Sequence, residues 1–421
     1  MSTPAIAEAR AELAEQLRAS GRAGPTVIAA FLAVPRHVFL PQIEAAQAYK
    51  DTAIMTKSDA RGLGVSSSTQ PAMMAIMIEQ LGLASGQRVL EIGTGTGYNA
   101  AIMATIIGDA RSVVTIDIEP DVVDQARANL AAAGFADVRV FCGDGADGVP
   151  SLASYDRIIV TAGAWDLAPQ WLAQLDAGGR IVLPLSVRGI QLSVAFERIG
   201  NHWVSRSICR CRFIRMTGTS AGPEPVLPLG PAPGLHAQVA DGPAPEADLL
   251  YGALSGPAAA VAAGLRVGGI GKLADLDLWL ALTEQGLTRI NMIGRPEGRA
   301  DEAQQRIAGL LPLGGFVRHG ASGSMEVAAL TVASGGRSEM TEHSDIEVTI
   351  TGYGTNGAAF ATYLAERAAV WDGLGRPSVG TLKLRAYPAG TRPEIIEGDI
   401  TIDRPNDVLV AGWPAPRNLP A

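Results

Sequence analysis

The 421-residue sequence has only three cysteines, few aromatic residues and no apolar run long enough to cross a membrane. An odd number of cysteines provides no disulfide framework, which favours a reducing compartment. Cys209-x-Cys211 lacks the second pair that a zinc site needs, so we expect two strand residues and no metal site. Glu8 and Glu12 stand where a signal peptide would be apolar, and residues 100–107 are too few to span a bilayer. We therefore expect a cytoplasmic protein with no membrane partner.

Positive charge is also scarce. The chain has 34 Lys and Arg against 42 Asp and Glu, a net charge of −8, which argues against a nucleic-acid partner. Almost half of the residues, 47%, are hydrophobic, enough to form real cores. The length exceeds one ordinary domain, so we expect two or three.

The most informative stretch is Arg88-Val-Leu-Glu-Ile-Gly-Thr-Gly-Thr-Gly-Tyr98. Its first part, residues 89–92, is typical of a buried parallel strand, and residues 99–107 favour a helix. A strand, a glycine turn and a helix form a nucleotide-binding unit, although a tight turn without a ligand would need the same glycines. The third glycine comes one residue earlier than in a dinucleotide fingerprint, and Glu91 suits a cationic ligand. Both features point to S-adenosylmethionine (SAM), which carries an ammonium and a sulfonium.

Further strands are expected at residues 112–116, 138–141, 155–160 and 179–183. Polar residues or glycines follow several of them, including Asp117, which comes 24 positions after Gly93, near the spacing of a ribose-binding acid. Since parallel strands end at one edge of a sheet, these residues predict a single ligand site. The expected fold is a doubly wound, Rossmann-like α/β sheet.

The N-terminal layer is expected to contain a helix over 5–20, an extended segment bracketed by prolines over 34–41, and a polar loop up to Gly64. The segment Ser66-Ser-Ser-Thr-Gln-Pro71 then leads into a helix over 72–81, with Thr69 or Gln70 as its cap and Gly82 at its end. The alternative is that Thr69 and its neighbours line a pocket beside the glycine turn.

The second half has a different pattern. Residues 219–245 are expected to be a proline-rich linker or irregular crossing segment, since residues 218–245 contain seven prolines. Alternating stretches at 345–351, 381–386 and 399–403 predict antiparallel strands, and residues 355–371 predict a helix. We therefore expect a first domain over 1–218 and a separate C-terminal α+β domain over 246–421.

Residues 5–218 resemble the protein-L-isoaspartate O-methyltransferase family. The resemblance rests on the following motifs: Val34-Pro-Arg-His-Val-Phe-Leu-Pro41, Ala48-Tyr-Lys-Asp51, Ser68-Thr-Gln-Pro-Ala-Met73, Val89-Leu-Glu-Ile-Gly-Thr-Gly-Thr-Gly-Tyr98, Gly143-Asp-Gly145, Tyr155-Asp-Arg-Ile-Ile-Val-Thr-Ala162 and Leu175-Asp-Ala-Gly-Gly-Arg-Ile-Val-Leu-Pro184. It implies a SAM-dependent transferase with S-adenosylhomocysteine (SAH) as product. The residues it implies for the cofactor, with Asp117 at the ribose and Asp144 at the adenine, are Glu91, Gly93, Thr94, Gly95, Gly97, Asp117, Ile118, Asp144, Gly145 and Thr161. It also implies that Ser68, Thr69 and Gln70 orient the substrate carboxylate.

Two departures point to a peptide-tailoring branch of this family. Thr69 stands where repair enzymes have serine, and about two hundred residues follow the point where those enzymes end. Trp371-x-x-x-Gly375-x-Pro377 is also similar to a motif of that branch, although a helix end with a buried tryptophan would have the same pattern. Relatives in the branch, found with lasso peptides, graspetides and lanthipeptides, methylate an aspartate of a ribosomally made peptide, and the ester closes to a succinimide (aspartimide).

Three function classes remain open at this point: a peptide-tailoring methyltransferase, an isoaspartate repair enzyme with an added module, and a SAM-binding protein without catalysis. An aspartate side chain has an ordinary pKa of about 3.9 and is ionised at neutral pH, so the substrate needs no general base. We expect structural roles for His37, His202 and Asp156. We expect the C-terminal domain to recognise the peptide, with a lid or a dimer contact as alternatives, and the sequence does not indicate an oligomeric state.

Overall fold

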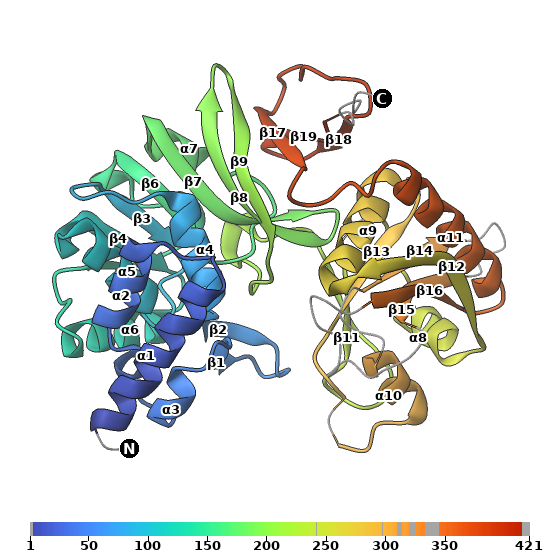
Figure 1. Cartoon of the computed structure of the whole chain (residues 1–421), viewed down its shortest axis with the longest axis horizontal. Coiled ribbons are helices and arrows are strands. Elements are labelled where there is room, and N and C mark those ends of the chain that lie inside the picture. The colour runs from blue at the N-terminus through green and yellow to red at the C-terminus, as the bar shows by residue number, and fades with distance from the viewer. Residues whose placement is uncertain are drawn as a thin grey trace.

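The computed structural model describes residues 3–240, 242–296, 298–309, 314–319, 325–332 and 345–414. Parts of the expected C-terminal domain, including residues 415–421, lie outside these ranges. The described residues form two lobes around two large sheets, with a small β1–β2 hairpin beside the first (Figure 1). No helix among them is both long and apolar enough to span a bilayer.

The first lobe is built on a ten-stranded sheet in the order β18-β19-β17-β9-β8-β7-β6-β3-β4-β5. Strands β7, β6, β3, β4 and β5 are parallel, and the others are antiparallel. The chain order reverses between β6 and β3, which is where open α/β sheets bind ligands. This confirms the expected Rossmann-like fold. Its elements are α1 (Thr3–Ala19), α2 (Pro25–Ala33), η1 (Arg36–Phe39), α3 (Ala45–Ala48), β1 (Ile54–Ser58), β2 (Gly64–Ser68), α4 (Pro71–Leu81), β3 (Val89–Ile92), α5 (Tyr98–Ile107), β4 (Val113–Asp117), α6 (Pro120–Ala132), β5 (Arg139–Cys142), η3 (Gly145–Asp147), β6 (Tyr155–Val160), α7 (Pro169–Gln174), β7 (Leu175–Val187), β8 (Ile190–Ile199), β9 (His202–Arg210), η5 (Gly218–Ser220), β17 (Lys383–Pro388), β18 (Ile400–Asp403) and β19 (Asp407–Gly412).

The second lobe is a seven-stranded antiparallel sheet in the order β10-β11-β13-β14-β15-β16-β12. Helices α9 and α11 cover one face, and α8 packs on the other with α10 beside it. Its elements are β10 (Val226–Pro228), β11 (His236–Val239), α8 (Ala247–Ser255), β12 (Ala258–Gly268), α9 (Gly269–Thr283), β13 (Thr288–Ile293), α10 (Glu302–Gly309), β14 (Gly315–His319), β15 (Met325–Val332), β16 (Asp345–Tyr353) and α11 (Gly357–Gly373).

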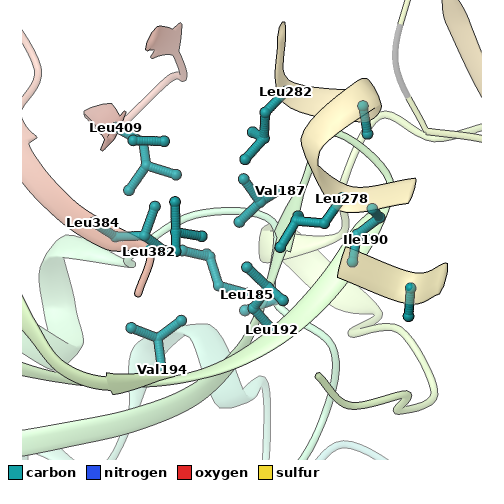
Figure 2. Close-up of a cluster of buried hydrophobic side chains, with 14 of the residues drawn as sticks. Leu185, Val187, Ile190, Leu192, Val194, Leu278, Leu282, Leu382, Leu384 and Leu409 are labelled. Atoms are coloured by element: carbon teal, nitrogen blue, oxygen red, sulfur yellow. The ribbon is translucent and has the colours of Figure 1, made fainter. Parts of the chain in front are cut away.

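The two lobes share one hydrophobic core. Side chains of β7 and β8 meet those of α9 on one side and those of β17 and β19 on the other (Figure 2). Within the second lobe, Arg289 on β13 donates to both carboxylate oxygens of the buried Asp277 on α9, at 2.6 and 2.8 Å. Arg210 at the end of β9, in the first lobe, donates to the same carboxylate at 3.1 Å and so links the two lobes. The seam between the lobes is therefore packed and carries an ion pair, unlike a loose linkage.

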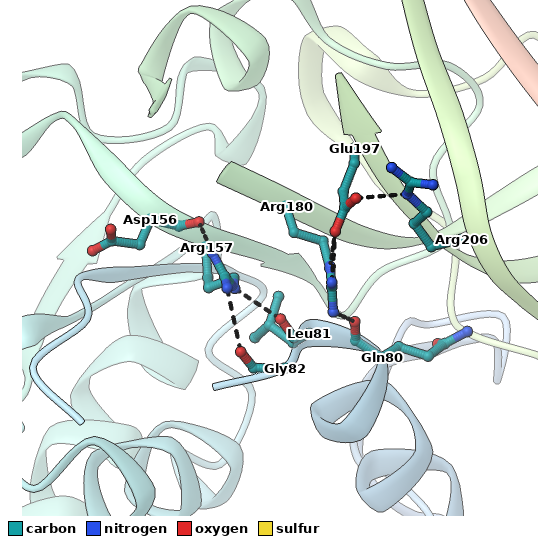
Figure 3. Close-up of polar contacts among 8 residues, drawn as sticks. All are labelled: Gln80, Leu81, Gly82, Asp156, Arg157, Arg180, Glu197 and Arg206. Atoms are coloured by element: carbon teal, nitrogen blue, oxygen red, sulfur yellow. Dashed lines mark hydrogen bonds and ion pairs between the residues drawn. The ribbon is translucent and has the colours of Figure 1, made fainter. Parts of the chain in front are cut away.

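Helix α4 is fixed to the sheet at its C-terminal end. Arg180 donates to the Gln80 carbonyl at 2.9 Å, and Arg157 donates to the Leu81 carbonyl at 2.8 Å (Figure 3). Cations suit these carbonyls because the helix C-terminus carries partial negative charge. Anchoring this end places the N-terminal end of α4, with Thr69 and Gln70 before it, beside the glycine turn.

Two expectations for the N-terminal layer are wrong. Residues 36–39, expected to be extended, form the 3₁₀ helix η1. The expected polar loop before Gly64 contains strand β1, which pairs with β2. Both differences arise from partners distant in the sequence, which local composition does not reveal.

The second half differs from expectation at both ends. The proline-rich residues 219–245 contribute β10 and β11 to the second sheet, where a linker or irregular crossing was expected. Strands β17, β18 and β19, expected in a separate C-terminal domain, instead extend the first sheet through pairing of β17 with β9. In the sequence, the second lobe is therefore an insertion between two segments that both belong to the first lobe. The expected helix ending at Trp371 is present as α11.

Candidate functional site

The glycine turn after β3 has a backbone that only glycine adopts easily. Gly93, Gly95 and Gly97 have φ angles of 99°, 52° and 86°, in the left-handed region. A Cβ at Gly93 would lie 2.6 Å from Thr161 Oγ1, and one at Gly97 would lie 3.0 Å from Leu130. Thr161, at the end of β6, also donates to the Gly93 carbonyl at 2.7 Å. The turn thus forms a glycine cradle, in which the backbone is exposed without side chains, and Thr161 packs against one side of it.

Glu91 holds this turn from behind. Its side chain is fully buried and accepts hydrogen bonds from Asn99 at 2.8 Å and Thr115 at 2.7 Å. Burial raises the pKa of Glu91 to about 7, although these two bonds oppose the shift. Thr94 joins the network through Thr115, at 2.8 Å. Because Glu91 and Thr94 face inward, they support the turn rather than offering charge or hydroxyl to a ligand, which corrects our expectation for Glu91.

Asp117 ends β4 beside the turn. Its carboxylate accepts the Gly95 N–H at 3.0 Å, and it is partly exposed. Burial raises the pKa of Asp117, and hydrogen bonds from backbone N–H groups oppose that rise. The next side chain, Ile118, is apolar and 36% exposed. A carboxylate next to an exposed apolar side chain fits a ribose followed by an adenine ring.

Asp144 lies after β5 and is held by a segment from beyond β9. Its Oδ1 accepts the Ala146 N–H at 2.9 Å, and its Oδ2 accepts the N–H and hydroxyl of Thr219 at 2.7 and 2.9 Å. These bonds outweigh the effect of partial burial and lower the pKa of Asp144. A carboxylate has about four acceptor positions, so one remains for an amino group such as that of adenine. A Cβ at Gly145 would lie 2.6 Å from Ile92, so this position also needs a bare backbone.

The expected substrate residues have different surroundings. Ser68 is buried with its hydroxyl 3.3 Å from Arg36 Nη2, and Gln70 donates to Asp51 Oδ2 at 3.0 Å. Thr69 is half-buried, and no described residue hydrogen bonds to its hydroxyl. Since Ser68 is buried and the Gln70 amide donates to Asp51, Thr69 offers the accessible donor at this edge.

Arg36 and Asp51 organise this edge, and our sequence reasoning missed both. The guanidinium of Arg36 is fully buried and donates to the Thr69 carbonyl at 2.9 Å and the Ala48 carbonyl at 2.8 Å. Asp51 Oδ1 accepts the Ala72 N–H at 2.8 Å, so it caps α4 in place of Thr69 or Gln70. Charged residues inside the two motifs around positions 36 and 51 were the available signal.

The β1–β2 hairpin covers the start of α6. Lys57 binds Glu119 and Asp121, both at 2.6 Å, directly after Asp117 and Ile118. A Cβ at Gly95 would lie 3.4 Å from the Ser67 carbonyl, so β2 runs against the glycine turn. The expected substrate and cofactor residues are therefore neighbours.

The other candidates have structural surroundings. His37 Nδ1 lies 2.8 Å from the Tyr49 hydroxyl, and burial lowers its pKa. His202 stacks on Tyr387 with ring centroids 4.6 Å apart, and Asp156 accepts the Arg88 N–H at 2.8 Å. The described residues contain no group of three His, Cys, Asp or Glu that could hold a metal ion.

The family model "Protein-L-isoaspartate(D-aspartate) O-methyltransferase (PCMT)" matches residues 8–221, about half of the chain. The chain belongs to this methyltransferase family. A protein-L-isoaspartate O-methyltransferase of Archaeoglobus fulgidus is 43% identical over 178 residues, which cover 42% of this chain and 80% of that protein. One of Methanoregula boonei is 40% identical over 203 residues, covering 48% of this chain and 89% of that protein.

Solved structures of similar proteins include a protein-L-isoaspartate O-methyltransferase with a TM-score of 0.48 and 24% identity, covering 89% of this chain and 96% of that one. Another, from Plasmodium falciparum in complex with SAH, has a TM-score of 0.44 and 19% identity, covering 49% of this chain and 97% of that one. The PCMT family consists of SAM-dependent protein carboxyl O-methyltransferases, so this chain is an enzyme of that class and uses SAM. The glycine cradle and the carboxylates at 117 and 144 fit an adenosyl group.

Proposed function

We propose that this protein methylates a side-chain carboxylate of an aspartate in a ribosomally synthesised peptide, and that the ester then closes to a succinimide. The observation that carries the proposal is the second lobe. It lies outside residues 8–221 and is joined to the first lobe by a shared core and by the Arg210–Asp277 ion pair between β9 and α9. A rigidly attached lobe of this size supports a dedicated polypeptide substrate rather than any damaged protein.

In the proposed cofactor site, Gly93, Gly95, Gly97 and Gly145 present bare backbone to the nucleoside. Asp117 accepts from the ribose, Ile118 packs on the adenine, and Asp144 accepts from its amino group. Thr161, Glu91 and Thr94 keep the turn in shape. Bound SAM supplies an electrophilic methyl group on its sulfonium.

The substrate carboxylate is its own nucleophile, because an aspartate with its ordinary pKa of about 3.9 is ionised at neutral pH. The chain must therefore hold one carboxylate oxygen in line with the methyl group, and such alignment can contribute roughly 7–11 kcal/mol. Thr69 is the residue we assign to this task, through its hydroxyl. Arg36 and Asp51 keep Thr69 in place by binding its carbonyl and capping the helix that follows.

Methylation prepares the second step. The next backbone nitrogen of the peptide attacks the ester carbonyl, methanol leaves, and a five-membered imide remains. This closure needs no enzyme group in our proposal.

A second candidate, isoaspartate repair, is favoured by the names of the relatives, which are protein-L-isoaspartate O-methyltransferases. The two candidate functions use the same cofactor site and differ in the polypeptide substrate. Mass spectrometry separates them: the full-length protein with SAM is offered an aspartyl precursor peptide encoded beside its gene, and in parallel a generic isoaspartyl peptide.

The tailoring proposal predicts a gain of about 14 Da on the precursor followed by a net loss of about 18 Da, the masses of one CH2 gained and one water lost. Methylation of the isoaspartyl peptide alone would overturn it in favour of repair. The test must use the full chain, because removing the residues after 218 would also remove β17–β19 from the first sheet.

A further inference from the structure

The turn between β18 and β19 docks against the loop that follows β6. Arg404 is buried and donates to the Trp165 carbonyl at 2.6 Å and to the Ser186 carbonyl at 2.5 Å. Asn406 donates to Asp166 Oδ2 at 2.6 Å. We call residues 404–407 the clamp turn.

A third contact completes the docking. The Leu167 N–H donates to Asp407 Oδ2 at 3.1 Å, so three consecutive residues of the loop, 165–167, are bound by the clamp turn. The Arg404 guanidinium also lies over the Trp165 ring, 5.8 Å from its centroid. A loop held by its carbonyl, its side chain and its N–H has little freedom to shift.

The same loop holds the segment that crosses the cofactor site. Residues 213–222, which we call the strap, run from the end of β9 past the ends of β6 and β5. Gly163 binds the strap on both sides: its N–H donates to the Ile214 carbonyl at 2.7 Å, and its carbonyl accepts the Met216 N–H at 2.9 Å. A Cβ at Gly222 would lie 3.0 Å from the Trp165 side chain, so the far end of the strap rests on the residue that Arg404 binds.

The strap in turn sets Asp144. Thr219 lies within the strap and supplies two of the three hydrogen bonds that this carboxylate accepts. The contacts therefore run without a gap from the clamp turn to the loop, from the loop to the strap, and from the strap to Asp144.

We propose that the clamp turn, through Arg404, is a positioning device for the cofactor site, acting on Asp144 by way of the loop and the strap. This inference rests on the proposed role of Asp144 and goes beyond it, because residues 404–407 lie outside the matched residues 8–221. The C-terminal hairpin is thus a working part of the cofactor site, apart from any role of the second lobe in recognising a peptide.

The test is the dissociation constant for SAH, measured by calorimetry on full-length variants together with their melting temperatures. Arg404→Met should raise this constant about tenfold, equivalent to about 1.4 kcal/mol. Asn406→Ala, which removes one contact and keeps Arg404, should raise it about threefold, as should the conservative Arg404→Lys. At saturating SAM, kcat should stay within about twofold of wild type, because the clamp turn touches neither the peptide nor the methyl group.

Arg385→Met is the matched control. Arg385 is a partly buried arginine on β17 of the same sheet, paired with Asp399 and not with the loop. It should lower the melting temperature without changing the SAH constant, as any purely structural loss would. If Arg404→Met does not fold, Asn406→Ala and Arg404→Lys carry the test.

Asp117→Ala distinguishes a failure of the clamp inference from a failure of the cofactor-site assignment. If Asp117→Ala weakens SAH binding while Arg404→Lys and Asn406→Ala bind SAH as tightly as wild type, the clamp inference is wrong and the cofactor site stands. If Asp117→Ala also leaves the affinity unchanged, the assignment of the cofactor site itself is overturned.

Discussion

Asp144 and Thr219 lie 75 positions apart in the chain, yet the N–H and the hydroxyl of Thr219 both donate to Oδ2 of Asp144, at 2.7 and 2.9 Å. The preceding residue, Gly218, has a φ of +79°, and a Cβ there would lie 2.6 Å from the same oxygen. The close approach of the strap to Asp144 therefore depends on a glycine.

Gly218→Ala should weaken SAH binding by about tenfold or more, because the methyl group displaces Asp144. A left-handed alanine adds a backbone cost of roughly 1–2 kcal/mol. Gly390→Ala is the control, since Gly390 has a φ of +80° and nothing within 4 Å of its Cβ position. It should show the backbone cost in the free energy of unfolding and no change in SAH affinity. Equal affinities for SAH in both variants would contradict the role given to the strap.

Thr69→Val removes the hydroxyl and keeps the shape of the side chain. We expect kcat/KM for the peptide to fall by about 10- to 100-fold, as for other groups that orient a reacting atom, with the SAH affinity unchanged. Steady-state kinetics at saturating SAM measure this.

Thr69→Ser keeps the hydroxyl and removes the methyl group that narrows the site. It should raise the rate on a generic isoaspartyl peptide relative to the aspartyl precursor. An unchanged ratio of the two rates would show that the threonine methyl does not select the substrate.

Glu91→Gln should change how stability depends on pH. The folded pKa of Glu91, about 7, lies above its ordinary value of 4.5, because burial disfavours the carboxylate. A raised carboxyl pKa means that the folded state holds the proton longer, so this residue costs stability as pH rises from about 4.5 to 7. The free energy of unfolding of Glu91→Gln, relative to wild type, should therefore improve by roughly 2 kcal/mol between pH 5 and pH 8. Glu12→Gln, on the exposed face of α1, is the control for the substitution itself in the same denaturant titrations.

Asp277→Ala tests the buried carboxylate of the second lobe that also binds Arg210 of the first. It removes the carboxylate that two arginines share in a buried position, which should lower the free energy of unfolding by about 3–5 kcal/mol. The control is Asp345→Ala, which breaks an exposed pair with Arg266 and should cost about 1 kcal/mol or less. A similar small loss in both variants would mean that the buried carboxylate contributes no more to stability than an exposed ion pair does.

The parts of the fold that follow from local pattern were predicted well. Strands β3 and β6 begin and end at the expected residues, because a buried parallel strand is a continuous apolar run. The helix expected over 355–371 is also present, although α11 ends two residues later, at Gly373. The Gly375 and Arg376 N–H groups bond back to the Asp372 and Trp371 carbonyls at 2.9 and 3.0 Å, a Schellman motif.

Long-range partners account for what the sequence did not reveal. Residues 36–39 form a 3₁₀ helix because the Arg36 guanidinium donates hydrogen bonds to the carbonyls of residues 48, 50 and 52. In the candidate site, the positions of Gly93, Asp117 and Asp144 could be predicted from strand ends. The inward orientation of Glu91 and the engagement of Gln70 by Asp51 depend on three-dimensional neighbours that a linear pattern does not contain.

The pairing of β9 with β17 also affects how the chain folds during translation. The Leu384 N–H donates to the Ser205 hydroxyl across 179 positions of chain, and the whole second lobe is translated in between. At translation rates of about 5–20 residues per second, β9 is synthesised on the order of ten seconds or more before β17, the strand that pairs with its edge. During that interval the nascent chain exposes an open β edge, so its yield in the cell should depend on whether a chaperone reaches that edge before another chain does.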